Sequence, residues 1–286
     1  MERKVVLITG ATDGLGKAAA LALAKQGATV VIVGRDPAKT RATAGEMKEQ
    51  SGTPSADGLV ADLSSMAEVR RLANELRQGY SRLDVLINNA GAIFARRQAT
   101  VDGYERTFAL NHLSQFLLTN LLLSILEAGA PSRIINVSSQ AHEGGAIDFD
   151  DLQGERSYGI GGGRAYSRSK LANIMFTYEL ARRLTGAGVT ANALHPGTVA
   201  TRFGEDNGGM MRLGMRMFHR FAISAEEGAD TIIYLASSPE VEGVTGGYWE
   251  KRRPIRSSPA SYDEGAQKRL WDVSAQMTGL VASARA

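Results

Sequence analysis

Short apolar runs rich in β-branched residues alternate with segments of helical periodicity along most of the chain. Residues 5–9 form the first such run, and a helical pattern follows from Gly14 to Gln26. Residues 28–33 form the second run, after which Asp36 and Pro37 are of the types that begin a helix. Because these runs do not alternate apolar with polar residues, both faces of each strand should be buried. The pattern predicts an α/β fold, a single doubly wound (Rossmann-type) parallel sheet with helices on both faces.

Four further strands and four further helices continue this alternation. The strands are predicted at residues 59–61, 83–87, 133–137 and 189–194, and the helices at 65–78, 104–126, 165–184 and 224–237. Ser65 with Glu68, and Ser224 with Glu227, have the spacing of a capping box, in which a serine and a glutamate bind the first amides of a helix. No linker interrupts the series, so we expect residues 1–286 to form one domain.

Two long segments depart from the alternation. Residues 141–164 contain three consecutive glycines, and here the sequence is equally compatible with a functional loop and with a loose surface insertion. Residues 198–223 contain four methionines among several glycines. Methionine suits a surface that closes on varied apolar shapes, so we predict a substrate lid in this segment. An amphipathic helix that completes the core is the alternative.

Composition and charge exclude several classes of protein. The chain has 33 Lys and Arg against 30 Asp and Glu, and its one basic run, Lys251 to Arg253, is broken by Pro254, which predicts a solvated turn and no nucleic-acid partner. The absence of cysteine excludes disulfides and thiolate chemistry. The 4 histidines are scattered, so we predict no metal site and a structural role for His195. No apolar run approaches the roughly 20 residues of a spanning helix, and we expect a cytoplasmic protein with no membrane span.

A glycine-rich turn follows the first predicted strand and leads into the first predicted helix. Residues 9–16 read TGATDGLG. Glycine lets the backbone approach a pyrophosphate closely, and a helix N-terminus supplies free amide groups and partial positive charge. The alternative is a turn whose glycines serve only close packing. We expect dinucleotide binding by this turn, through Gly10, Thr12, Asp13, Gly14, Leu15 and Gly16.

The TGxxxGxG spacing of this turn resembles that of the short-chain dehydrogenase/reductase family, and other motifs agree along the chain. These are NNAG at residues 88–91, Asn111 in the long helix, Ser138-Ser139 after the fifth strand, YxxxK at residues 166–170 and Pro196-Gly197 after the sixth. Residues 136–142, 166–173, 195–197 and 269–274 look like the retinol-dehydrogenase-like branch. Many animal members of that branch carry an N-terminal membrane anchor, and we expect none here.

The resemblance implies that Asn111, Ser139, Tyr166 and Lys170 are catalytic. Tyr166 and Lys170 are four residues apart, so they share one helix face, where the ammonium favours the phenolate. Tyr166 would give or take the hydroxyl proton, Ser139 would polarise the carbonyl, and Asn111 would link Lys170 to solvent through a water. Singly, each residue type is common on surfaces or at helix caps. Together they indicate an oxidoreductase that transfers a hydride between a nicotinamide and the carbonyl or alcohol carbon of a small, apolar substrate.

The end of the second strand bears on the choice of cofactor. Gly34 and Arg35 stand where NAD-specific members usually carry an acidic residue, so NADP(H) is predicted over NAD(H), although Asp13 stands where many NADP-dependent members have a basic residue. Further cofactor contacts are predicted at Asp62, Leu63, Asn89, Ala90, Gly91, Tyr166, Lys170, Pro196, Gly197, Val199 and Thr201.

Two other functions are compatible with these motifs. One is reduction of a C=C bond, as in the protochlorophyllide reductases, and the other is a non-catalytic NADP-sensing binding protein. The family resemblance also suggests a homodimer or homotetramer.

Overall fold

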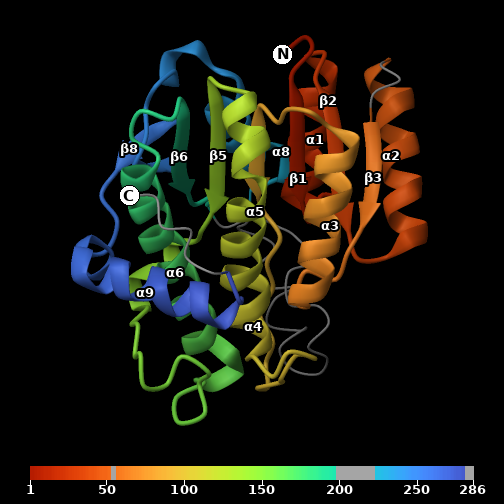
Figure 1. Cartoon of the computed structure of the whole chain (residues 1–286). Coiled ribbons are helices and arrows are strands. Elements are labelled where there is room, and N and C mark those ends of the chain that lie inside the picture. Colours follow the sequence, from red (N-terminus) through yellow and green to blue (C-terminus); the bar gives the residue numbers. More distant parts are fainter. Residues whose placement is uncertain (53–55, 198–222, 281–286) are drawn as a thin grey trace.

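The computed structural model of the chain describes residues 1–52, 56–197 and 223–280, and its described strands form one sheet (Figure 1). The strands are β1 (Val5–Thr9), β2 (Thr29–Gly34), β3 (Ala56–Val60), β4 (Val85–Asn88), β5 (Ser132–Val137), β6 (Val189–Leu194), β7 (Tyr248–Glu250) and β8 (Arg253–Ile255). Their order is β3-β2-β1-β4-β5-β6-β7-β8, and neighbouring strands are parallel except β7 and β8. The predicted doubly wound parallel sheet is confirmed, with one short antiparallel strand added at its edge.

Helices cover both faces of this sheet. One face is covered by α1 (Gly14–Lys25), α2 (Pro37–Ser51) and α8 (Ala225–Ser237), and the other by α3 (Met66–Gly79), α5 (Ser114–Ala128) and α6 (Gly163–Arg183). A last helix, α9 (Glu264–Met277), packs against α6 and lies across the lower half of α5 in Figure 1. The predicted alternation of strand and helix therefore gives the three layers expected of it.

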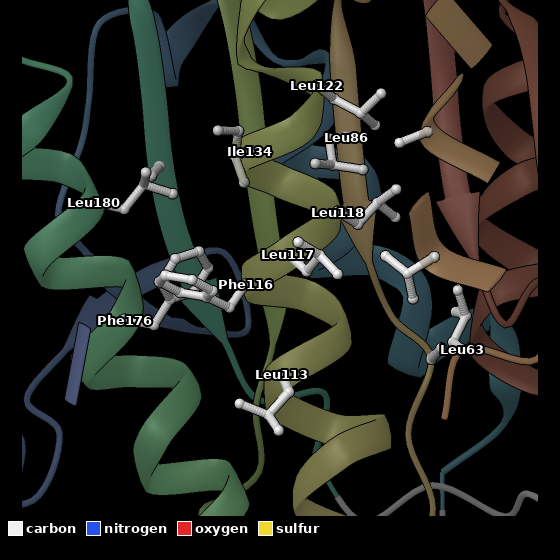
Figure 2. Close-up of a cluster of buried hydrophobic side chains, with 14 of the residues drawn as sticks. Leu63, Leu86, Leu113, Phe116, Leu117, Leu118, Leu122, Ile134, Phe176 and Leu180 are labelled. Carbon is white, nitrogen blue, oxygen red and sulfur yellow. The ribbon is translucent and has the colours of Figure 1, made fainter. Parts of the chain in front are cut away.

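The larger core lies between the sheet and the layer of α3, α5 and α6. Figure 2 shows Leu117, Leu118 and Leu122 of α5 pointing toward Leu86 of β4 and its neighbours. Trp271 of α9 extends this cluster, because its ring lies 5.0 Å from that of Phe116 and 5.8 Å from that of Phe176. Helix α5 is buried on most sides, which explains its near-continuous apolar sequence. The stretch from Arg106 to Ala128 has the length and composition of a membrane-crossing helix, but 72% of its apolar window is buried in the fold.

The predicted helix starts are confirmed at α2 and α8, but the capping box predicted at the start of α3 is wrong. The Asp36 carboxylate accepts the amide of Lys39 at 2.8 Å, and Ser224 and Glu227 form both bonds of a capping box. Ser65 precedes α3 but its side chain makes no cap hydrogen bond.

The reason lies in competing partners at the start of α3. The Arg71 guanidinium binds the Glu68 carboxylate that would complete the box, with Nη2 and Oε2 2.9 Å apart. The amide of Ser65, which that carboxylate would accept, donates instead to the carbonyl oxygen of Asp62, at 3.0 Å.

The long helix predicted at residues 104–126 contains a change of helical type. It begins as the short α4 (Arg106–Phe108), continues as a π-helical turn, η1 (Ala109–Leu113), and becomes α5. Both carboxylate oxygens of Glu105 accept first-turn amides, from Thr107 at 2.6 Å and Phe108 at 2.8 Å. A π-helical turn leaves a local irregularity in the backbone hydrogen bonds of a helix, and such turns are frequent at functional sites.

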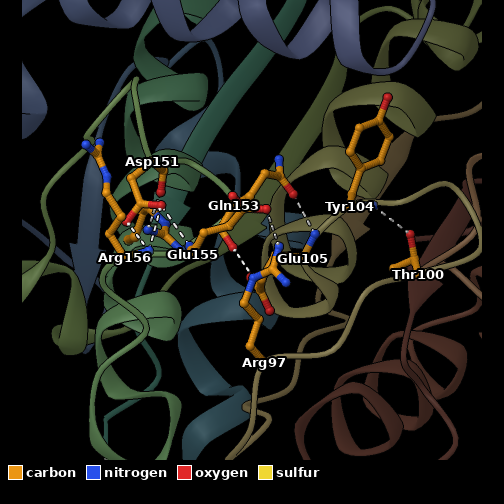
Figure 3. Close-up of polar contacts among 9 residues, drawn as sticks. Arg97, Thr100, Tyr104, Glu105, Asp151, Gln153, Glu155 and Arg156 are labelled. Atoms are coloured by element: carbon orange, nitrogen blue, oxygen red, sulfur yellow. Dashed lines mark hydrogen bonds and ion pairs between the residues drawn. The ribbon is translucent and has the colours of Figure 1, made fainter.

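Polar contacts fix the segment between residues 141 and 164, which settles the alternative left open by its glycine content. Figure 3 shows Arg97 donating to the carbonyl of Gln153 at 2.8 Å, and the Gln153 amide oxygen accepting the Glu105 amide at 2.6 Å. The Asp151 carboxylate accepts the amide of Glu155 at 2.7 Å. The two bonds of Gln153 tie the segment to residues 97–105, so the alternative of a loose surface insertion is wrong, and a functional role for the segment stays a prediction.

Candidate active site

The site lies at the carboxyl ends of the parallel strands. The strand order reverses between β1 and β4, and in open α/β sheets a ligand binds at such a reversal, beyond the carboxyl ends of the strands. The glycine-rich turn follows β1, residues 89–91 follow β4, Ser138 and Ser139 follow β5, and residues 195–197 follow β6. The predicted motifs therefore meet at one edge of the sheet.

Side chains of the predicted motifs hold the glycine-rich turn in place. The hydroxyl of Thr9 accepts the amides of Asn89 and Ala90, each at 3.0 Å. The Asn89 amide group donates to the carbonyl oxygens of Thr9 at 2.9 Å and Gly10 at 3.1 Å. The side chain of Asn89 therefore stabilises the conformation of the turn. Thr9 was not among the predicted site residues, although its position directly before the first glycine could have suggested it.

Two glycines of the turn are required by close packing. A Cβ atom on Gly10 would lie 2.8 Å from Cα of Ala90, and one on Gly16 would lie 2.5 Å from Nδ2 of Asn89. Gly10 and Gly14 also have positive φ, of 64° and 50°. The N-terminus of α1 supplies amide groups and partial positive charge of the kind that bind a diphosphate, although the Asp13 carboxylate already accepts the amide of Gly14.

Asp13 caps α1 and holds a lysine from the next helix. Its Oδ1 accepts the amide of Gly14 at 2.9 Å, while its Oδ2 lies 2.7 Å from Nζ of Lys39, in the first turn of α2. Arg35 is exposed directly after β2. Two cationic side chains, Arg35 and Lys39, thus follow β2 beside the glycine-rich turn. Lys39 was missed from the sequence, because only this fold brings it to Asp13.

The ends of β2 and β3 explain two further predicted positions. A Cβ atom on Gly34 would lie 2.3 Å from Oγ1 of Thr40 and 2.4 Å from Cγ2 of Thr12, so there is no room for a carboxylate at this position. Asp62 accepts the amide of Ser64 at 2.9 Å and its hydroxyl at 2.7 Å, as a turn residue does. The side chain of Leu63 is buried in the core, which leaves its backbone for any contact outside the fold.

Tyr166 and Lys170 lie on one face of α6, as their spacing predicts. Nζ of Lys170 is 5.7 Å from the centre of the Tyr166 ring and donates to the carbonyl oxygen of Val137 at 2.9 Å. Burial lowers the pKa of Lys170 to about 8. Burial raises the pKa of Tyr166 to about 12, and a hydrogen bond from Ser139 acts in the opposite direction. A buried ammonium and a phenol whose charged form is disfavoured are thus held side by side.

Ser139 and its neighbour Ser138 connect β5 to this pair. The hydroxyl of Ser138 donates to the carbonyl of Lys170 at 2.8 Å, which joins the end of β5 to α6. Ser139 precedes the short helix η2 (Gln140–Gly144), and its Oγ accepts the amide of Ala141 at 3.2 Å. Because Oγ accepts that amide, its own proton is directed to other acceptors, among them the phenolic oxygen of Tyr166.

Asn111 lies in the π-helical turn, and its side chain is engaged by protein groups. Its Oδ1 accepts the amide of Ala92 at 2.9 Å, and its Nδ2 donates to the carbonyl of Ala92 at 3.0 Å and to Oγ of Ser169 at 2.9 Å. The side chain therefore fastens the segment after β4 to α6. A Cβ atom on Gly91 would lie 3.3 Å from both Asn111 Oδ1 and Lys170 Nζ, which places these groups close to the NNAG motif.

The remaining predicted residues fall into two groups. Pro196 and Gly197 follow β6 at the same edge of the sheet, where the amide of Gly197 donates to Nδ1 of His195 at 3.2 Å. His195 is buried beside Tyr248, consistent with a structural role. Val199, Thr201 and the predicted lid at 198–223 lie outside the described residues, except Ile223.

Comparisons with known proteins find relatives over nearly the whole chain. The sequence profile for short chain dehydrogenases matches residues 4–151. Retinol dehydrogenase 14 of Mus musculus is 45% identical over 295 residues, covering 98% of this chain and 87% of that protein. A Streptomyces protein named as a daunorubicin C-13 ketoreductase, DnrU, is 44% identical over 276 residues, covering 96% of this chain and 93% of that protein. The structure of Pseudomonas aeruginosa RhlG in an NADP active-site complex has a TM-score of 0.69 and 29% identity, covering 87% of this chain and 94% of that chain.

Proposed function

The chain belongs to the short chain dehydrogenase family, and on that basis we propose that it transfers a hydride between NADP(H) and the carbonyl or alcohol carbon of a small, apolar substrate. Its family and relatives identify it more broadly as an NAD(P)-dependent oxidoreductase that acts on CH–OH or C=O groups. The observation that carries the proposal is the convergence of Ser139, Tyr166 and Lys170 beside the glycine-rich turn.

The nicotinamide supplies or accepts the hydride when bound, and the other tasks fall to side chains of this chain. Ser139 donates its hydroxyl proton toward the substrate oxygen, which polarises a carbonyl for attack. Tyr166 gives its phenolic proton to that oxygen during reduction and removes it during oxidation. The Lys170 ammonium stabilises the phenolate. The hydrogen bonds of Asn111 hold the segment after β4 against α6, so that the catalytic groups keep their relative positions.

Charge and space at the end of β2 support NADP(H) as the preferred cofactor. An NAD-dependent site of this fold uses a carboxylate there for the ribose hydroxyls, but Gly34 has no room for one. Arg35 is exposed where a 2′-phosphate would lie, and arginine binds phosphate in two-point geometry. The NADP complex of RhlG is consistent with this choice.

The names of the relatives support an apolar substrate. Retinol is an apolar polyene alcohol, and the name of the Streptomyces protein specifies a ketone as the reacting group. Both names describe chemistry at CH–OH or C=O rather than at C=C. We therefore place alcohols and ketones with apolar bodies first among candidate substrates.

A substrate panel tests the proposal. Ketones, aldehydes and alcohols are followed through the absorbance of the reduced nicotinamide, with NADP(H) and NAD(H) in parallel. Turnover of a carbonyl or alcohol that falls about 10²- to 10⁴-fold in Tyr166→Phe, with cofactor binding retained, supports the proposed chemistry. Product analysis that finds a reduced C=C bond and an intact carbonyl favours the first alternative. Tight cofactor binding with no turnover across the panel favours the sensing protein.

Cell location and assembly are part of the same proposal. A chain without cysteine suits the reducing cytoplasm, where we place it, and fractionation with the membranes would contradict that location. Family membership favours a homodimer or homotetramer, which sedimentation equilibrium would distinguish from a monomer.

A further inference from the structure

His142 is a buried histidine that joins the loop of Ser139 to a distant part of the chain. It lies in η2, three residues after Ser139, and is 1% exposed. Its Nδ1 is 2.8 Å from the carbonyl oxygen of Ser139. Its Nε2 is 3.0 Å from the backbone nitrogen of Ser258, more than 100 residues further along the chain.

The two contacts fix the proton on the ring. A backbone amide only donates, so Nε2 must accept from Ser258 and therefore carries no proton. In the neutral imidazole the proton is then on Nδ1, where the nearest acceptor is the Ser139 carbonyl. Burial lowers the pKa of His142, which favours this neutral form. The imidazole thus links Ser139, to which it donates, with Ser258, from which it accepts, and the hydroxyl of Tyr248 also lies 3.3 Å from Nδ1.

The far end of this link is anchored to the helix that carries Tyr166 and Lys170. Ser257, next to Ser258, shares a 2.7 Å hydrogen bond between its hydroxyl and that of Tyr178, on α6. The amide of Ser257 also donates to the hydroxyl of Tyr262 at 3.1 Å. Residues 257–262 therefore form a brace between α6 and the imidazole, distinct from the Ser138 bond that joins β5 to α6.

We propose that His142 is a positioning residue that sets the placement of the Ser139 hydroxyl relative to α6, through the Ser139 carbonyl and the 257–262 brace. This inference rests on the proposed function, in which Ser139 contacts the substrate oxygen. The Ser139 carbonyl and Oγ belong to one residue whose conformation is also held by the Ala141 amide, so rotation at the carbonyl displaces the hydroxyl. A misplacement of about 1 Å in a reacting group can lower turnover about 10²-fold.

Two substitutions each keep one end of the link. In His142→Asn, the side-chain amide lies where Nδ1 lies and can donate to the Ser139 carbonyl, but it does not reach Ser258. In His142→Gln, the longer amide reaches the Ser258 nitrogen and loses the Ser139 bond. Because the proposal requires both ends, each variant should lower kcat by about 10- to 100-fold while the cofactor Kd stays within about twofold. Wild-type kcat in both variants would overturn the proposal.

A double-mutant cycle separates positioning of Ser139 from general damage. In a Ser139→Ala background there is no hydroxyl to position, so both His142 substitutions should lower the residual kcat by less than about threefold. An equal loss in both backgrounds would show that His142 does not act through Ser139. If Ser139→Ala itself retains wild-type kcat, the serine's role in the proposed function fails and the inference fails with it. A loss from Ser139→Ala without coupling to His142 overturns the inference alone.

A control and a second measurement complete the test. Ser258→Ala keeps the backbone amide and removes a hydroxyl that has no hydrogen-bond partner among the described residues, so its kcat should match the wild type. Hydrogen exchange of peptides covering residues 136–145 provides a readout independent of activity. His142→Gln should raise exchange there and leave β1 unchanged, whereas unchanged exchange at 136–145 would contradict the proposed brace.

Discussion

The ammonium group of Lys170 donates a 2.9 Å hydrogen bond to the carbonyl oxygen of Val137, although the lysine is only 3% exposed. Removing it from water lowers its pKa from 10.5 to about 8. Below pH 8 the Lys170 side chain is charged in both states, but this charge is buried in the folded chain and hydrated in the unfolded chain. At about 1.36 kcal/mol per pKa unit, this charge destabilises the fold by about 3 kcal/mol.

Lys170→Met should therefore change how stability depends on pH. Between pH 8 and 10.5 the unfolded wild type binds this proton and the folded wild type does not, so the wild type gains stability as pH rises. Over that range, the unfolding free energy of Lys170→Met minus that of the wild type should fall by about 3 kcal/mol. Urea denaturation at several pH values measures it. The exposed Lys25 offers the control, because the corresponding difference for Lys25→Met should stay constant. A constant difference for Lys170→Met would refute the prediction.

The two directions of the reaction should differ in their dependence on pH. Burial raises the pKa of Tyr166 to about 12 and the hydrogen bond from Ser139 lowers it, so oxidation, which needs the phenolate, should accelerate as pH rises to about 8, the range in which Lys170 keeps its charge. Reduction uses the protonated tyrosine and should show no such rise. Removing a hydrogen bond to a charged group, worth about 1.5–3 kcal/mol, should shift the oxidation profile of Ser139→Ala upward by one to two pH units. Profiles of kcat/KM in both directions check this, and an unshifted profile would contradict it.

The sequence predicts the part of this fold that is encoded by periodicity. Residues 189–194 are predicted as a strand and 224–237 as a helix because regular elements carry strong apolar patterns, and the structure has β6 at Val189–Leu194 and α8 at Ala225–Ser237. Strands β7 and β8 were not predicted, since each has three residues and one is the basic Arg253–Ile255. Lys251 and Arg252 do form the expected turn, with positive φ of 47° and 61°.

The contacts of a site residue can be predicted from the sequence when its partner is a few residues away. They cannot be predicted when the fold brings the partner from a distant segment. Tyr166 and Lys170 share a face by their spacing alone. Asn89 was predicted as a cofactor contact, but its side-chain bond to the Gly10 carbonyl appears only once β1 and β4 are neighbours. His142 belongs to the motif of residues 136–142, but no role was predicted for it. Its partner Ser258 is far away in the sequence and comes near it only in the folded chain. Long-range pairs of this kind leave no spacing signal.

Two glycine substitutions should have opposite effects on stability. Gly10→Ala forces a side chain onto a residue with φ of 64°, and its Cβ would lie 2.8 Å from Cα of Ala90. Strain and overpacking together should lower the unfolding free energy by about 2–4 kcal/mol. Gly45→Ala, in the exposed middle of α2 with open space around the new Cβ, should raise it by about 0.5–1 kcal/mol. Thermal unfolding of both variants measures the difference, and a neutral Gly10→Ala would show that the turn relaxes more than its packing suggests.

Arg35, Lys39 and Asp13 should together set the affinity for a 2′-phosphate. Charge-assisted hydrogen bonds are worth about 1.5–3 kcal/mol, so Arg35→Ala and Lys39→Met should each weaken binding of 2′,5′-ADP about 10- to 100-fold and leave 5′-ADP unchanged. Asp13→Asn keeps the cap on Gly14 but removes the carboxylate that holds Lys39 at 2.7 Å, so it should bind 2′,5′-ADP a few-fold more tightly. Calorimetric titration of both nucleotides decides the matter. If Lys39→Met binds 2′,5′-ADP as the wild type does, the lysine serves only the ion pair with Asp13, and the preference for NADP(H) must depend on Arg35 alone.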